Sequence, residues 1–328
     1  MSDECVLVTG ATGFVGSHLV ESLLINGFYV RALTHSESGA RGIASNEVEL
    51  IRGDVTDIAS VTRALRGCRR VYHLAAAMPH RGYSRREIRS VNVEGTRNVG
   101  RAALRTGLER VVLGSSTGVY GGTAAAAIDE KAPATPDSPY RASKRDAEQV
   151  LLALHEAEGL SVAITRPSSM VGWRSSGWLR LCGAISTGRF LLVGQGRNRV
   201  HLCPVAEAVA GLELCGEVPA ADGEAFILCA DRPTTARGLV SAFAEELGVP
   251  GPVGSLPAAP FRVMRAVNRL GYRAAGVELG VSRRYDLFFD DKAYDNSKAK
   301  QKLGLQPRAS VREAVRDTVR WYREQEGR

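Results

Sequence analysis

The chain has 328 residues, 44% of them hydrophobic and 24% charged, a balance typical of one large globular α/β unit or of two lobes around a cleft. No apolar run approaches the roughly 20 residues of a membrane-spanning helix, and the N-terminus has no secretory signal, so we expect a cytoplasmic protein without a membrane partner. The net charge of +8 permits an anionic partner, but no block of basic residues is interleaved with aromatic ones, so we expect no nucleic-acid partner.

Strands and helices are expected to alternate through the first half of the chain. Short apolar runs predict the strands, and the amphipathic segments between them predict the helices. Strands are expected at residues 5–9, 29–33, 48–51, 70–74, 110–113 and 161–165, and helices at residues 14–26, 58–66, 87–105 and 140–158. This order predicts an α/β protein with a doubly wound parallel sheet that helices cover on both faces.

The pattern loosens after Pro167, where glycine and proline interrupt shorter segments. We expect residues 168–194 and 231–328 to form a smaller, mixed C-terminal lobe that binds the substrate. Residues 1–167 would form the first domain. Residues of about 195–230 would return to that domain, with a strand at residues 225–229.

Six cysteines are scattered along the chain without a CxxC pair or a histidine cluster nearby. They are Cys5, Cys68, Cys182, Cys203, Cys215 and Cys229. This spacing predicts reduced, mostly buried thiols and no metal site.

A glycine-rich turn, Gly10-Ala-Thr-Gly13-Phe-Val-Gly16, joins the first strand to the first helix. Gly10 would allow a tight turn, Gly13 would let the backbone approach a pyrophosphate, and Gly16 would let the helix pack closely on the sheet. The amides of a helix N-terminus also favour an anion. We therefore predict a dinucleotide site that includes Gly10, Thr12, Gly13, Phe14, Val15 and Gly16.

Tyr140 and Lys144 lie four residues apart, on one face of the helix expected at residues 140–158. A phenol with its ordinary pKa of about 10 is a poor base at neutral pH, and a nearby ammonium group favours the phenolate. With the glycine turn, this pair predicts hydride transfer with a nicotinamide cofactor, in which Tyr140 moves a proton on the substrate oxygen. Lys144 would also hold the nicotinamide ribose, so both residues are expected to contact the cofactor.

Several segments form a familiar series along nearly the whole chain. They are TGATGFVG (9–16), GDVTD (53–57), HLAA (73–76), NVEGT (92–96), SSTGVYG (115–121), YRASK (140–144), RP (166–167) and YDNSKAKQKLG (294–304). In this order they resemble the extended, epimerase-type short-chain dehydrogenases/reductases of the NAD-dependent epimerase/dehydratase superfamily. The resemblance implies a Rossmann-type fold and an NAD(P)-dependent oxidoreductase.

The resemblance also implies roles for individual residues. Ser116 would hydrogen-bond the substrate oxygen and complete a catalytic trio with Tyr140 and Lys144, with Thr117 as the alternative hydroxyl. Further cofactor contacts would come from Asp54, Val55, Leu74, Ala75, Ala76, Asn92, Pro167 and Ser169. Each has a plainer alternative, such as a capping aspartate or a packed strand.

The choice of cofactor depends on the end of the second strand. NAD-selective relatives usually carry an aspartate there, which binds the ribose diol, whereas this chain has Thr34 followed by His35, with Arg31 and Arg41 nearby. We therefore expect Thr34 and His35 to contact the cofactor. We also expect NADP(H) to be favoured over NAD(H). Relatives often dimerise through the two long helices that correspond to residues 87–105 and 140–158, so a homodimer is expected.

Two substrate classes fit the resemblance, a small-molecule ketone or secondary alcohol and a sugar nucleotide that is epimerised or dehydrated. Ser169 replaces the asparagine usual in sugar-nucleotide enzymes, and residues 194–207 depart from their pattern, so we favour the ketone or alcohol. Apolar residues at 173–185 would suit a ring, or would only close the core of the small lobe. Arginines at residues 81–89 would suit an anionic substrate, or would be solvated. A non-catalytic regulatory protein that binds NADP(H) is a minor alternative.

Overall fold

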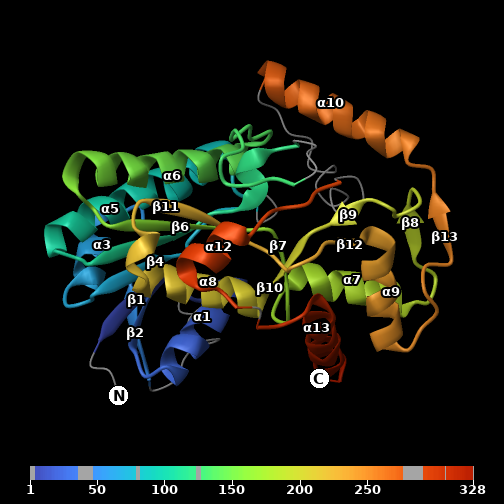
Figure 1. The fold of residues 1–328 in the computed structure, drawn as a ribbon, viewed down its shortest axis with the longest axis horizontal. Helices are drawn as coiled ribbons and strands as arrows, with labels where there is room; N and C mark the ends of the chain where they lie inside the picture. The colour runs from blue at the N-terminus through green and yellow to red at the C-terminus, as the bar shows by residue number, and fades with distance from the viewer. Residues whose placement is uncertain are drawn as a thin grey trace.

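The computed structural model of the protein describes residues 4–35, 47–78, 82–122, 127–275, 291–306 and 308–327. Its centre is a sheet of seven strands in which every neighbouring pair runs parallel (Figure 1). The strand order is β11–β6–β5–β4–β1–β2–β3, with β1 Cys5–Thr9, β2 Tyr29–Thr34, β3 Val48–Arg52, β4 Arg70–His73, β5 Arg110–Gly114, β6 Val162–Pro167 and β11 Glu224–Leu228. The expected strands are confirmed, with small differences at their ends.

Helices cover both faces of this sheet. They are α1 Phe14–Ile25, α8 Val205–Glu217 and α12 Ser297–Leu303 on one face, and α3 Ile58–Leu65, α5 Gly95–Thr106 and α6 Pro139–Glu158 on the other. Three consecutive residues of β1, Val6 to Val8, are fully buried, as expected of a strand that is covered on both sides. The prediction of a doubly wound α/β sheet is therefore confirmed.

The strand order reverses direction at β1, because β2 and β3 lie on one side of it and β4, β5 and β6 on the other. In such sheets the ligand crevice opens outside the carboxyl ends of the strands at this reversal. The glycine turn leaves β1 at this end, and Ser116 follows β5 at the same end.

The helix expected at residues 87–105 is confirmed as an uninterrupted helical run over residues 85–106, but one turn in it is wider than in an α-helix. The structure has a short helix α4 (Arg85–Arg89), a π-helical turn η2 (Ser90–Glu94) and then α5. The turn carries Asn92, whose side-chain amide donates to Ala77 O at 3.1 Å and accepts from Ala77 N at 2.7 Å. The π-helical turn thus coincides with the pairing of Asn92 and Ala77, which lies in the segment after β4. Helical periodicity in the sequence does not reveal such a turn.

The smaller lobe is built from short strand pairs and helices around its own core. Its pairs are β7 Ser169–Val171 with β10 Leu202–Pro204, β9 Arg199–Val200 with β12 Thr234–Thr235, and β8 Leu191–Val193 with β13 Gly254–Leu256. Its helices are α7 Ser176–Ser186, α9 Ala236–Leu247, α10 Ala259–Ala275 and α13 Val311–Glu326. Two short turns, η3 Thr117–Tyr120 and η4 Pro219–Ala221, belong to the sheet half. Trp178 stacks on Phe243 with ring centroids 5.5 Å apart, and Ile185 is buried in the same cluster. Trp178 and Ile185 therefore close the core of the small lobe, which was one of the two roles expected for the apolar residues at 173–185.

The division into lobes is less simple than a cut at fixed residues. Residues 195–230 were expected to return to the sheet, and α8 and β11 do so, but β9 pairs with β12 in the small lobe. Conversely, α12 packs into the core of the sheet half although it lies near the end of the chain. Among the described residues, no helix combines the length and the apolarity needed to cross a bilayer.

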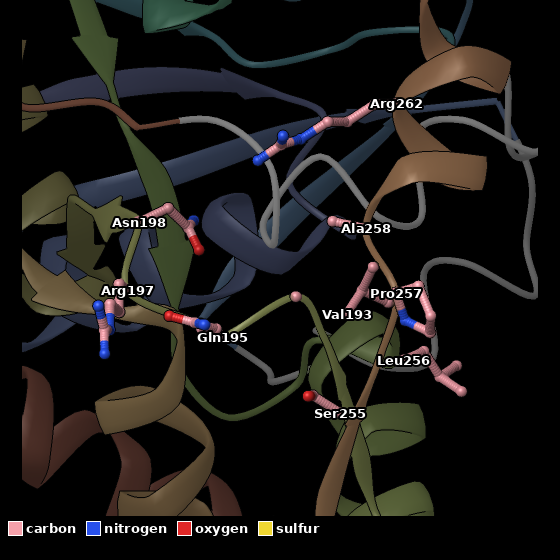
Figure 2. A pocket seen from close by; sticks show the side chains of 11 residues that line it. Val193, Gln195, Arg197, Asn198, Ser255, Leu256, Pro257, Ala258 and Arg262 are labelled. Atoms are coloured by element: carbon pink, nitrogen blue, oxygen red, sulfur yellow. The ribbon is translucent and has the colours of Figure 1, made fainter.

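A cavity of about 560 Å³ opens in the small lobe between the turn after β8 and the start of α10. Residues 193–198 form one wall, and residues 255–258 with Arg262 form the other. Figure 2 shows the side chains of Arg262 and Asn198 reaching toward the space between them, whereas Arg197 points away from it. The size of the cavity is suited to a small molecule.

Candidate active site

The glycine turn after β1 is so closely packed that two of its glycines cannot be replaced. Gly10 has φ +72°, and a Cβ there would lie 2.6 Å from the backbone of Leu74 and Ala75. A Cβ on Gly16 would lie 2.1 Å from Gly10 O. The glycine turn therefore packs against Leu74 and Ala75, just after β4. The cofactor contacts predicted for the glycine turn and for residues 74–76 thus lie close together.

The residues of this turn fit a dinucleotide. Gly13 caps α1 without a side-chain hydrogen bond, and a Cβ on it would meet only Gly10 O, at 3.1 Å. The first N–H groups of a helix have no acceptor within the helix and carry partial positive charge, so they favour the pyrophosphate anion. Beside them, Thr12 is exposed, and Phe14 and Val15 are half-buried.

A buried polar network lies beneath the turn. Thr9 Oγ1 is 2.7 Å from His73 Nδ1, and His73 Nε2 is 3.0 Å from Thr96 Oγ1. Burial, and secondarily the charge of Lys144, lowers the pKa of His73 to about 3, so the imidazole is neutral at ordinary pH. This network joins β1, β4 and α5, and sequence analysis did not identify it.

Lys144 lies in the second turn of α6 and its ammonium group reaches the end of β5. Lys144 Nζ donates a hydrogen bond to Gly114 O at 2.7 Å, and its side chain is buried. Desolvation lowers the pKa of Lys144 to about 8, although the Glu148 carboxylate opposes the shift. Tyr140 is half-buried one turn earlier, close to the start of α6, where Ser138 Oγ accepts from Arg141 N.

Ser116 follows β5 by two residues, so the hydrogen bond of Lys144 to Gly114 holds the ammonium group beside the segment that carries Ser116. Ser116 Oγ accepts from Gly118 N at 3.0 Å and thereby caps η3, and its side chain is half-buried. The fallback Thr117 is buried and donates to Pro167 O at 3.4 Å. These placements leave Ser116 as the more accessible of the two hydroxyls.

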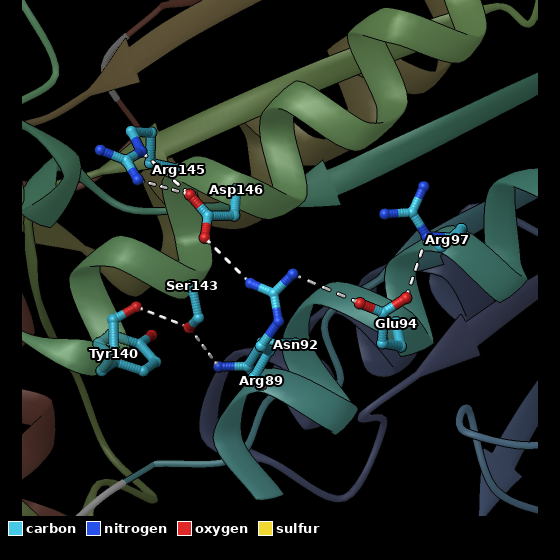
Figure 3. Close-up of polar contacts among 8 residues, drawn as sticks. All are labelled: Arg89, Asn92, Glu94, Arg97, Tyr140, Ser143, Arg145 and Asp146. Atoms are coloured by element: carbon cyan, nitrogen blue, oxygen red, sulfur yellow. Dashed lines mark hydrogen bonds and ion pairs between the residues drawn. The ribbon is translucent and has the colours of Figure 1, made fainter. Parts of the chain in front are cut away.

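Asn92 supports the start of α6 (Figure 3). Its side-chain amide donates to Ser143 Oγ at 2.9 Å, and Ser143 Oγ donates to Tyr140 O at 2.7 Å. Because Asn92 is buried and its side chain also pairs with Ala77, these contacts favour a positioning role over the direct cofactor contact that was predicted.

A second buried network continues from α6 to β6. Arg166 donates to both oxygens of Glu148, with Nη2 2.6 Å from Oε2 and Nε 3.0 Å from Oε1. Ser115 Oγ also donates to Glu148, and Arg166 Nη1 donates to Tyr120 OH at 2.8 Å. Arg166 belongs to a segment that carries the family resemblance, but only the fold reveals that it pairs with Glu148.

Other predicted contacts have side chains that are already engaged. Asp54 Oδ1 accepts from Thr56 N at 2.8 Å in a local turn, whereas the cap of α3 is Asp57, and Val55 is buried against Gly95. Arg31 donates to Glu49 and to Ala64 O, which leaves its guanidinium directed away from a role in cofactor choice. Asp54 is exposed, so cofactor contacts by Asp54 and Val55 stay predictions.

The remaining predicted residues lie around the same strand ends. Thr34 ends β2, His35 is exposed directly after it, and Arg41 is outside the described residues. Ala76 is half-buried after β4, Pro167 is buried at the end of β6, and Ser169 is exposed in β7. These placements keep the predicted contacts as predictions.

The arginine-rich segment after β4 is described only in part, because His80 and Arg81 lie outside the described residues. Arg85 and Arg86 are exposed in the first turn of α4, which Ser84 and Glu87 begin with a capping box. Arg89 forms exposed ion pairs with neighbouring carboxylates on α6 and on the π-helical turn (Figure 3). In the described part, the solvated alternative is the better description.

Comparisons with known proteins agree with this arrangement. Residues 6–228 match the NAD dependent epimerase/dehydratase family. Sterol demethylase protein B of Methylococcus capsulatus is 32% identical to the chain, over 97% of the chain and 98% of its own length. The 4-hydroxy-2-methyl-3-oxo-4-farnesyl-3,4-dihydroquinoline-1-oxide ketoreductase of Stigmatella aurantiaca is 31% identical, over 80% of the chain and 78% of its own length. The dTDP-glucose 4,6-dehydratase DesIV of Streptomyces venezuelae, solved with NAD bound, has a TM-score of 0.78 at 26% identity, with 98% of each chain covered.

Proposed function

Because the chain belongs to the NAD dependent epimerase/dehydratase family and is an NAD(P)-dependent oxidoreductase, we propose that it interconverts a small-molecule ketone and its secondary alcohol, with NADP(H) as the preferred cofactor. The hydrogen bond from Lys144 to Gly114 O carries this proposal, because it holds a buried cation one helical turn from Tyr140 and beside the segment of Ser116.

The chain's own residues divide the work of the reaction. The nicotinamide, when bound, supplies or accepts the hydride. In the reductive direction the Tyr140 hydroxyl donates a proton to the substrate oxygen, and the Lys144 ammonium stabilises the phenolate that remains. The Ser116 hydroxyl hydrogen-bonds the same oxygen and favours the charge that develops on it. The Asn92–Ser143 contact holds the turn of α6 that carries Tyr140.

The substrate class is supported by two kinds of observation. Two relatives of at least 30% identity carry names that refer to a sterol and to a farnesylated ring ketone. In this chain Ser169 stands where sugar-nucleotide enzymes usually have an asparagine, and a serine offers a diphosphate a weaker contact. An apolar ring substrate is the class that these features favour. Homodimerisation and the absence of a nucleic-acid partner stay predictions.

The preference for NADP(H) is supported by Thr34 at the end of β2. Thr34 lacks the carboxylate that would repel a 2′-phosphate at this position. The ratio of kcat/KM for NADPH and NADH with one substrate tests it, and a clear preference for NADH would contradict it. The variant Thr34→Asp should shift this ratio toward NADH, whereas Thr187→Asp, at an exposed position at the end of α7, should leave it unchanged.

The reaction itself is tested with purified protein, either reduced cofactor, and a panel of ring ketones, keto acids and sugar nucleotides. Nicotinamide absorbance reports net oxidation of the cofactor, and mass spectrometry identifies the product. Stoichiometric oxidation with a ketone that gains two hydrogens is the expected result. Isomerisation or dehydration of a sugar nucleotide without net change in the cofactor would favour the epimerase or dehydratase class, which the fold shared with DesIV also accommodates.

A further inference from the structure

The exposed apolar side chains of this protein are concentrated in one part of the small lobe. Among the described residues, six of the ten large apolar side chains that are exposed lie on β8, on β13 or just before it, and on α10. They are Leu191, Val253, Leu256, Val263, Val267 and Leu270. Elements β8 and β13 pair with each other, and α10 begins three residues after β13, so these side chains belong to one end of the lobe (Figure 1). Single exposed apolar residues are common on protein surfaces, whereas a cluster of them is typical of an interaction surface.

The helix α10 presents the most regular part of this cluster. Val263, Val267 and Leu270 follow one another at intervals of four and three residues, which places them on one side of the helix. Their exposed fractions are 64%, 54% and 68%, so the described residues leave this side uncovered. Phe261 and Met264, by contrast, are half-buried and lie on another side. Figure 1 shows α10 at the outer edge of the molecule.

The charges of α10 are of one sign. Its sequence contains Arg262, Arg265, Arg269 and Arg273 and no acidic residue. A helix whose charged residues are all arginines and which has an exposed apolar side suits the lipid–water interface, where apolar side chains enter the acyl region and positive charge favours anionic headgroups.

We propose that α10 attaches the protein to the surface of an anionic lipid bilayer, with Val263, Val267 and Leu270 inserted and the positive charge of the helix attracted to the anionic headgroups. The expectation of no membrane partner was based on spanning segments and a signal sequence. It does not apply to a helix that lies in the interface.

A bilayer explains this surface better than a second copy of the chain does. Two copies that paired through α10 would bring eight arginines together without a carboxylate from either helix, in a protein whose net charge is already +8. The start of α10 also forms a wall of the 560 Å³ cavity, through Ala258 and Arg262. Attachment through α10 would therefore hold this cavity close to the bilayer, where an apolar ring substrate of the proposed class is concentrated.

The proposal is tested by flotation of the full-length protein with vesicles of phosphatidylcholine alone and with vesicles that also contain phosphatidylglycerol. We expect binding to the anionic vesicles, weaker binding to the neutral ones, and release as the salt concentration rises. Val267→Asp and Leu270→Asp should each weaken binding to the anionic vesicles by about tenfold or more, because each replaces an inserted apolar side chain with a charge.

The matched control is Ile25→Asp, because Ile25 is 85% exposed at the end of α1, far along the chain from α10. It should bind vesicles like the unaltered protein, and circular dichroism should show that all variants are folded. Failure to bind anionic vesicles, or equal binding by the α10 variants, would overturn the proposal. A different result would also overturn it: no binding to vesicles by the unaltered protein, together with a dimer in sedimentation velocity that Val267→Asp converts to monomers. Vesicle binding needs no turnover, so this result is independent of the reaction assay.

Discussion

The sheet half contains a buried polar network, whereas the small lobe carries a cluster of exposed apolar side chains. In the sheet half, Glu148 and Arg166 form a buried ion pair, and His73 is a buried neutral imidazole between two threonines. In the small lobe, the ion pair of Arg312 with Glu245 is exposed, and valines of α10 face outward. The comparison indicates that the half with the proposed chemistry is internally fixed, whereas the lobe with the proposed substrate cavity is built to meet something outside itself.

The largest difference between the halves should appear in catalysis. Tyr140→Phe keeps the ring but removes the proton donor, so kcat should fall by about 10²- to 10⁴-fold while cofactor affinity changes little. Steady-state kinetics and a cofactor titration measure the two quantities. The control Tyr29→Phe removes an exposed hydroxyl, and its kcat should be unchanged. An unchanged kcat in Tyr140→Phe would exclude the proposed role of this residue.

Ion pairs in the two halves should differ in their contribution to stability. Glu148→Gln leaves the Arg166 guanidinium buried without its counter-charge, so the free energy of unfolding should fall by about 3–5 kcal/mol. Glu245→Gln removes an exposed pair and should change it by about 1 kcal/mol or less. Denaturant titrations of both variants make the measurement. Equal losses would mean that burial of the pair does not distinguish the halves.

A further difference between the halves is a dependence of stability on pH. The pKa of His73 is about 3 in the folded protein, and its ordinary value is 6.5, so the unfolded chain binds a proton first as the pH falls. The stability that the neutral imidazole contributes is therefore present above pH 6.5 and is lost between pH 6.5 and 3, by at most about 1.4 kcal/mol per pH unit. His73→Gln should reduce this slope in chemical unfolding, and His35→Gln, at an exposed site, should not. The same slope in both variants would contradict the assignment.

Much of the fold could be predicted because it depends on local patterns. Apolar runs gave the strands of the sheet, and the turn signals gave its glycine turn, whose Gly10 and Gly16 have no room for a side chain. The π-helical turn at 90–94 could not be predicted, because it accompanies the contact of Asn92 with Ala77, which lies on another element. Likewise, the sequence shows six scattered thiols, whereas the fold brings Cys5 Sγ within 3.2 Å of Cys68 Sγ.

The candidate site shows the same limit. Tyr140 and Lys144 could be paired from their spacing on one helix, because residues four apart lie on the same side. The partners of Lys144 and Glu148, which are Gly114 O and Arg166, lie 30 and 18 residues away in the chain. Their contacts depend on the order of β5 and β6 in the sheet, and no local pattern carries that information.

The sequence by itself determined the glycine turn, the Tyr–Lys pair and the alternation of strands and helices, because backbone sterics and helical or strand periodicity act between near neighbours. The tertiary structure alone decided which buried charges are paired and which apolar residues close a core. It also decided that the apolar side of α10 faces outward. Burial depends on every element that packs around a side chain, and those elements come from distant parts of the chain.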